Sequence, residues 1–186
     1  MTSRMLKSLM SKLLTITAIV LLNACSSTKV DEYASQTPVL KLSEYFNGNI
    51  QAFGIFTDRS GKVVKRFTVN IAANWKLVNG VNTGTLDESF LYSDGTTQKR
   101  IWTIKEVAQN QYEGTAADVV GVADGQAAGN ALNWRYTLLL PVDGKDIEVQ
   151  FNDWMYLINS KVMLNRAQMS KFGVYLGEVT LSFTKE

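Results

Sequence analysis

The sequence predicts an all-β domain: an antiparallel meander of about 8–10 strands that closes into a barrel. Two observations carry this prediction. Apolar and polar residues alternate with a period of two over residues 63–75, which is the pattern of a strand with one buried face. Similar runs follow one another almost to the C-terminus, and turns containing Gly, Asp or Asn separate most of them.

The N-terminus has the pattern of a secretory signal peptide. Arg4, Lys7 and Lys12 precede an uncharged apolar run over residues 13–22, and no acidic residue stands before that run. The run is about ten residues long, whereas a transmembrane helix needs roughly 20. We therefore expect residues 1–24 to be removed rather than to span a membrane.

The residues Leu22-Asn23-Ala24-Cys25 resemble the lipobox of bacterial lipoproteins. Ala24 supplies the small side chain that the signal peptidase needs before the cleaved bond, and Cys25 supplies the thiol that takes a diacylglycerol. A lone cysteine is otherwise a small core residue. Several acyl chains would anchor the protein stably in a membrane. Ser26, by resemblance to enterobacterial sorting rules, directs it to the periplasmic face of the outer membrane.

Composition excludes several classes of function. Removing Arg4, Lys7 and Lys12 from the 19 Lys and Arg leaves 16 against 17 Asp and Glu, so the mature chain is near neutral and no nucleic-acid partner is expected. The chain has one cysteine and no histidine. Nucleophiles paired with histidine and zinc sites ligated by histidine are thereby excluded. Carboxylate-only catalysis, a lysine-based nucleophile and an oxygen-ligand cation site stay open. We nevertheless expect no catalytic residue, metal or cofactor.

Residues 25–38 are polar, aperiodic and end at Pro38, which predicts a lipidated tether ahead of a barrel domain at 39–186. The domain opens with a short helical turn at about residues 40–46. This opening resembles that of lipocalin and calycin barrels in architecture only, because the tryptophan of the true lipocalin motif is absent and Phe53 is the nearest aromatic residue.

The strands are expected to be joined by short turns in chain order. Closing such a meander into a barrel hides both edge strands, and a two-sheet sandwich is the alternative. The Gly- and Ala-rich segment 115–130 fits neither a calcium loop nor a phosphate loop, so we interpret it as tight packing, with a lid over the barrel mouth as the alternative. The predicted strands cover residues 49–57, 62–75, 83–93, 97–107, 110–117, 130–140, 145–151, 153–159, 161–168 and 173–184.

Trp134-Arg135-Tyr136 and Asp153-Trp154-Met155-Tyr156 belong to a series of distinctive sequence blocks over residues 40–186. Together these blocks resemble the domain of unknown function 3833 family, lipoproteins of Gram-negative bacteria. The resemblance implies the lipoprotein class and carries no known activity. The blocks are residues 53–61, 86–90, 93–95, 100–102, 112–121, 129–131, 134–136, 153–156, 165–167, 169–173 and 177–179.

Arginines next to aromatic residues suggest a ligand site. In a barrel interior, arginine would bind a carboxylate or phosphate in bidentate fashion and the rings would pack on an acyl chain. The alternative is that these residues form surface salt bridges or caps at the rim. The candidate residues are Arg66, Arg100, Trp102, Trp134, Arg135, Tyr136, Trp154 and Arg166.

Three functions therefore stay open. The first is non-enzymatic binding of a lipid or other amphipathic molecule in the cell envelope, and the second is a structural or protein-interaction role there. The third is a hydrolase in which Asp87 or Glu88 works with Asp153, which requires the two carboxylates to lie within about 5–10 Å of each other.

Overall fold

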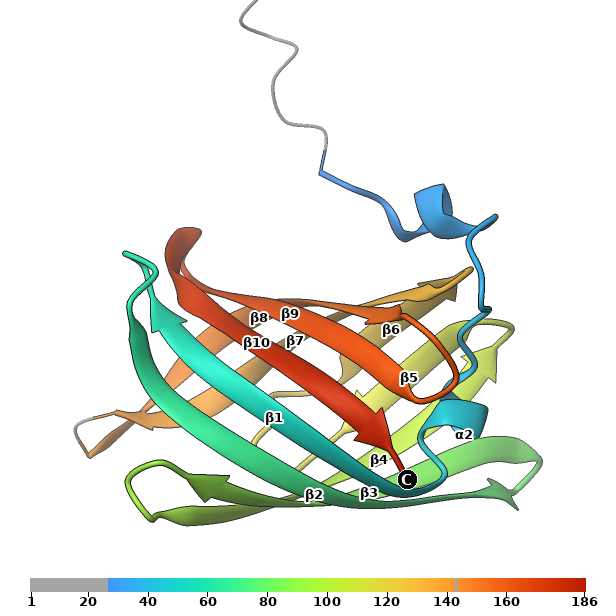
Figure 1. Ribbon diagram of the computed structural model, residues 1–186, viewed down its shortest axis with the longest axis horizontal. Helices are drawn as coiled ribbons and strands as arrows, with labels where there is room; N and C mark the ends of the chain where they lie inside the picture. The colour runs from blue at the N-terminus through green and yellow to red at the C-terminus, as the bar shows by residue number, and fades with distance from the viewer. Residues whose placement is uncertain (1–26, 143) are drawn as a thin grey trace, which may run out of the picture.

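The computed structural model describes residues 27–142 and 144–186. In this part of the chain ten antiparallel strands form one closed barrel (Figure 1). Two short helical turns precede them, η2 (Val30–Tyr33) and α2 (Leu42–Tyr45). The strands are β1 (Gly48–Asp58), β2 (Val63–Val78), β3 (Val81–Tyr92), β4 (Thr97–Ala108), β5 (Gln111–Thr115), β6 (Ala123–Ala128), β7 (Ala131–Val142), β8 (Lys145–Leu157), β9 (Val162–Lys171) and β10 (Val174–Lys185).

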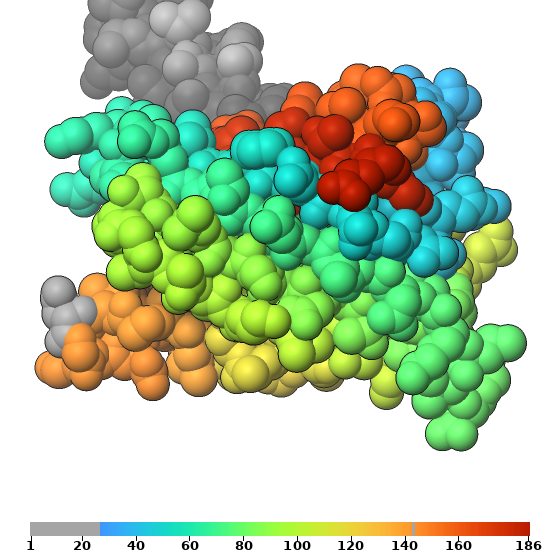
Figure 2. Space-filling model, turned by 60° about the horizontal axis from the view of Figure 1, so that its bottom comes forward, coloured from blue at the N-terminus to red at the C-terminus, as the bar shows by residue number. Residues whose placement is uncertain are grey.

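The predicted fold class is confirmed, and the sandwich is excluded. Each strand pairs with its neighbours along the chain, and β1 closes the ring by pairing with β10 from Ile50–Lys185 to Asp58–Gly177. In Figure 2 the red C-terminal strand accordingly borders the blue-green residues of β1. Closure leaves no unpaired sheet edge, which is the physical reason that a meander of this length ends in a barrel.

Two strand predictions were wrong in a related way. Residues 123–128 form strand β6, where the sequence predicts a packed loop or lid, and residues 145–157 form one strand where it predicts two. The inward positions of β6 are Ala123, Gly125 and Ala127, which are too small to stand out as an apolar face. In β8 the inward Asp153 interrupts an otherwise apolar face.

Gly125 shows why small residues are needed in β6. A Cβ atom on this residue would lie 2.7 Å from Cε3 and Cζ3 of Trp134, its partner across β7. The indole ring therefore lies flat over the backbone of β6. This close approach accounts for a glycine at an inward strand position.

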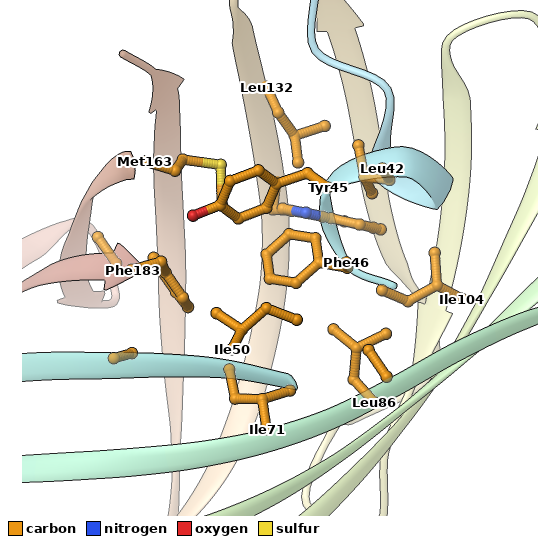
Figure 3. Close-up of a cluster of buried hydrophobic side chains, with 14 of the residues drawn as sticks. Leu42, Tyr45, Phe46, Ile50, Ile71, Leu86, Ile104, Leu132, Met163 and Phe183 are labelled. Atoms are coloured by element: carbon orange, nitrogen blue, oxygen red, sulfur yellow. The ribbon is translucent and has the colours of Figure 1, made fainter. Parts of the chain in front are cut away.

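One end of the barrel is closed by the short helical turn. Leu42 and Phe46 are each no more than 3% exposed and pack among side chains from β1, β2, β3 and β9 (Figure 3). Two hydrogen bonds hold the helical turn in place. Trp75 Nε1 donates to the Phe46 carbonyl at 2.8 Å, and the Tyr45 hydroxyl donates to the Lys161 carbonyl at 3.1 Å.

The segment predicted as a tether is packed against the barrel from η2 onward. Val30 is buried, and the ring of Tyr33 lies 5.8 Å from Trp154 and 5.5 Å from Tyr156. The Leu40 N–H donates to the Gly129 carbonyl at 2.8 Å. Isolated apolar residues in a polar segment have no periodicity, so the sequence gives no sign of this packing.

The predicted signal peptide (1–24), the cleavage site at Ala24 and the lipidation site at Cys25 lie outside the described residues. Within residues 27–142 and 144–186, no helix combines the length and apolar character needed to cross a membrane.

Candidate functional site

The barrel encloses a cavity of about 180 Å³. Pockets that take drug-sized ligands measure about 300–1,000 Å³, and an apolar cavity of about 150 Å³ holds a benzene-sized molecule. This cavity therefore fits a small molecule or one end of a larger one. Its apolar lining includes Phe56, Phe67, Phe90, Trp102, Trp134, Tyr136, Leu138, Phe151 and Leu181.

Four of the predicted ligand-site residues line this cavity. Arg100 and Trp102 come from β4, and Trp134 and Tyr136 come from β7. Each pair is separated by one residue, so both members face the same side of their strand. Trp102 and Tyr136 pack edge to face in the cavity lining, with ring centroids 5.7 Å apart and planes at 77°.

The other four predicted residues face outward and do not line the cavity: Arg66, Arg135, Trp154 and Arg166. The strand period explains this outward placement. Arg66 is next to the inward Phe67, and Arg135 lies between the inward Trp134 and Tyr136. Two of these side chains make contacts on the outer face of the barrel. Arg166 Nε donates to Glu178 Oε2 at 2.6 Å, and Trp154 stacks on Tyr156 with ring centroids 6.0 Å apart.

Arg100 is bound by carboxylates of its own chain. Its Nε donates to Asp118 Oδ1 at 3.1 Å, its Nη2 donates to Asp118 Oδ2 at 2.7 Å, and its Nη1 lies 3.8 Å from Glu88 Oε2. The guanidinium also lies 5.3 Å from the centroid of the Phe90 ring. These partners offset the cost of burying the charge of a side chain that is only 16% exposed.

Asp118 is not among the ligand-site residues predicted from the sequence, although it pairs with one of them. It lies in the loop of residues 116–122, between the short strands β5 and β6. The Leu139 N–H donates to the Asp118 carbonyl, and the Val120 N–H donates to the Thr137 carbonyl, both at 2.9 Å. The loop thus continues the barrel wall along β7, while the Asp118 side chain holds it to Arg100 of β4.

Two further carboxylates face the cavity, Glu88 from β3 and Asp153 from β8. Burial raises the pKa of Glu88 to about 7, and the nearby Arg100 opposes this rise. Burial also raises the pKa of Asp153 to about 6, opposed by hydrogen bonds from Tyr136 and Asn165. The Tyr136 hydroxyl donates to Asp153 Oδ2 at 2.9 Å, and Asn165 Nδ2 donates to Asp153 Oδ1.

Asp87, by contrast, is placed away from this cluster. It faces the outer surface next to Lys99, whose Nζ lies 3.3 Å from Asp87 Oδ1. Neighbouring residues of β3 point to opposite faces of the strand, so Asp87 points outward and Glu88 points into the cavity. The predicted acid–base pair of Asp87 with Asp153 is therefore ruled out, and of the two residues only Glu88 shares the cavity with Asp153. In the part of the chain that the structure covers, no group of three metal-ligating side chains is close enough to hold an ion.

Comparison with known proteins supports the fold. The barrel matches an S-type phycobiliprotein lyase from Guillardia theta with a TM-score of 0.59 and 5% identity, covering 86% of this chain and 98% of that one. This match confirms the predicted lipocalin-like architecture. A DUF3598-family protein of unknown function from Nostoc punctiforme aligns with a TM-score of 0.46 and 10% identity, covering 81% of this chain and 51% of that one.

Among curated proteins, none shows significant sequence similarity to this chain. A family match is nevertheless clear, because the family described as "Protein of unknown function (DUF3833)" matches residues 19–185. This is the family predicted from the sequence blocks. The chain belongs to the DUF3833 family.

Proposed function

We propose that this protein is an envelope lipoprotein that binds a small apolar or amphipathic molecule inside its barrel, without catalysing a reaction. The observation that carries the proposal is the cavity of about 180 Å³ with an apolar wall and one polar cluster. Ligand pockets commonly combine such a wall with a few polar groups that orient the ligand. A filled core would instead have favoured a purely structural or protein-interaction role.

The barrel interior is better suited to binding than to hydrolysis. A two-carboxylate hydrolase needs one carboxyl kept protonated as the acid and one kept ionised as the base or nucleophile. Here burial raises the pKa of both Glu88 and Asp153, to about 7 and about 6. Environments that push both groups in the same direction do not divide the acid and base roles between them.

Binding is tested by filling the cavity. Leu138 is 4% exposed and lines the cavity, whereas its neighbour Leu139 is 38% exposed on the outer face. We expect Leu138→Trp to abolish n-hexanol binding measured by calorimetry, because the larger side chain occupies the cavity. Leu139→Trp is the matched control and should bind like wild type.

Thermal unfolding of both variants checks that each is folded, and Leu181→Phe provides a second, smaller filling of the same cavity. A cavity-filled variant that is folded and binds n-hexanol as tightly as wild type would contradict the proposal. A complementary measurement is native mass spectrometry of protein purified without detergent, which should show a bound small molecule.

The membrane part of the proposal rests on Cys25. Four residues stand between Cys25 and the packed Val30, so an extended chain joins the two over at most about 18 Å. An anchor at Cys25 would therefore hold the barrel next to the membrane, on the side of η2. In cells, Cys25→Ser should remove the protein from the outer-membrane fraction, and unchanged fractionation would refute the anchor.

A further inference from the structure

The charges around the cavity do not match an anionic ligand. Three carboxylates lie around its polar cluster, Glu88, Asp118 and Asp153, against the single guanidinium of Arg100. Asp118 already occupies Nε and Nη2 of that guanidinium. The arginine that sequence reasoning assigned to a ligand carboxylate or phosphate is therefore committed to the protein itself.

Glu88 is the least satisfied of these groups. Its side chain is 13% exposed, and its nearest cation, Arg100 Nη1, lies 3.8 Å away, beyond hydrogen-bond distance. Among the described residues, no group donates a hydrogen bond to it. Asp153, by comparison, accepts hydrogen bonds from Tyr136 and Asn165. The Glu88 oxygens are not fully buried, since Asn130 Oδ1 is the one side-chain atom among the described residues that is fully buried without a partner. A carboxylate that is mostly removed from water and has no donor is still destabilised, and a donor brought by a ligand would offset that cost.

The aromatic walls also favour positive charge. Tyr136 and Phe151 line the cavity and stack with ring centroids 5.1 Å apart and an interplanar angle of 6°. The neighbouring Phe90 and Tyr92 rings already have cations of the protein over them, Arg100 at 5.3 Å and Lys65 at 4.2 Å. The faces of such rings carry negative electrostatic potential and attract organic cations. The aromatic rings and the carboxylates thus both favour a positively charged group in this cavity.

We infer that the ligand carries an amine-type cation on a compact apolar body and that Glu88 pairs with that cation. This inference rests on the proposed function, since it specifies the chemistry of the same cavity. The charged groups around Glu88 are Arg100 of β4, Asp118 of the 116–122 loop, Asp153 of β8 and Asp87 of its own strand.

Three probes that differ only in their polar end test the inference: n-hexylamine, n-hexanol and n-hexanoate. Each has an apolar chain of a size suited to a cavity of about 180 Å³. We expect n-hexylamine to bind wild-type protein at least about tenfold more tightly than n-hexanoate, measured by calorimetry at pH 8. Equal or tighter binding of n-hexanoate overturns the inference.

Two variants locate the effect. Glu88→Gln should weaken n-hexylamine binding by about tenfold and leave n-hexanol binding unchanged, because only the amine needs the carboxylate. Asp87→Asn, on the outer face of the same strand, should bind all three probes like wild type. Undiminished n-hexylamine binding by folded Glu88→Gln overturns the role of Glu88, and the wild-type comparison of probes stands even if that variant does not fold.

The pH adds an independent readout. The amine of n-hexylamine stays protonated well above pH 8, whereas Glu88 gains its charge as the pH rises through about 7. Amine affinity should therefore increase by about tenfold or more between pH 5.5 and 8, with little change for n-hexanol. Binding of n-hexanol without any preference for the amine defeats this inference alone, while binding of none of the three probes defeats the proposed function as well.

Discussion

The stability of this barrel should fall as the pH rises from 5 to 8. In the folded protein, burial raises the pKa of Glu88 to about 7 and that of Asp153 to about 6, from ordinary values of 4.5 and 3.8. The folded state then binds more protons than the unfolded state between these limits, so unfolding becomes easier with increasing pH. The destabilisation is absent below about pH 3, where both carboxyls are protonated in the folded and the unfolded state, and it is complete above about pH 8.

The expected loss is large enough to measure. A change in pKa from 4.5 to about 7 corresponds to about 3 kcal/mol for Glu88, most of which falls between pH 5 and 8. Asp153 adds about 1–2 kcal/mol over the same interval. A domain of this size has a free energy of unfolding of about 5–15 kcal/mol, so the pH dependence is a substantial fraction of the total.

The assay is urea unfolding followed by tryptophan fluorescence at several pH values. Because the chain contains no histidine, no side chain with an ordinary pKa titrates in this interval, and the signal comes from the buried carboxyls. Glu88→Gln should lose more than half of the slope, whereas Asp87→Asn on the outer face should keep it. Stability that is flat or rises with pH in the wild type, or an unchanged slope in Glu88→Gln, would refute the reasoning.

Three other substitutions have defined outcomes. Arg100→Met leaves Glu88 and Asp118 without a cation and should reduce the free energy of unfolding at pH 8 by about 3–5 kcal/mol, and by less at pH 5, in the same urea assay. Gly125→Val places a side chain against the Trp134 ring and should cost about 1–3 kcal/mol in thermal unfolding, with Gln126→Val as the outward control. Tyr136→Phe removes a hydrogen bond that lowers the pKa of Asp153, so the part of the stability change due to Asp153 should move to higher pH.

The architecture was predictable because a barrel meander repeats one local signal. The alternation of β2, with Phe67, Val69 and Ile71 buried and their neighbours exposed, is visible in the sequence, and the short turns require adjacent strands to pair. The failures lie where the inward residue does not look apolar or large. Gly125 in β6 and Asp153 in β8 both face inward, so the rule of alternation cannot recognise them.

Four of the eight predicted ligand-site residues line the cavity, and the other four face outward because side chains alternate along a strand. The motif Trp134-Arg135-Tyr136 places two aromatic residues on one face and the arginine on the other, so sequence adjacency alone cannot tell which residues meet in the cavity. The pairing of Arg100 with Asp118 depends on a loop that is 18 residues distant along the chain and on the shortness of β5 and β6. No local pattern encodes that contact.

The contrast between Arg100 and Glu88 follows from their different acid–base chemistry. A guanidinium in a protein cannot lose its proton, so a buried arginine needs a partner from its own chain whenever the protein is folded, and Asp118 provides it. A carboxyl group can instead take up a proton, which makes a buried glutamate tolerable without a hydrogen bond while the cavity is free. In a small closed barrel, a carboxylate can therefore lack a hydrogen-bond partner until a ligand binds, whereas a guanidinium cannot. The sequence pattern of arginines next to aromatic residues predicts the opposite assignment.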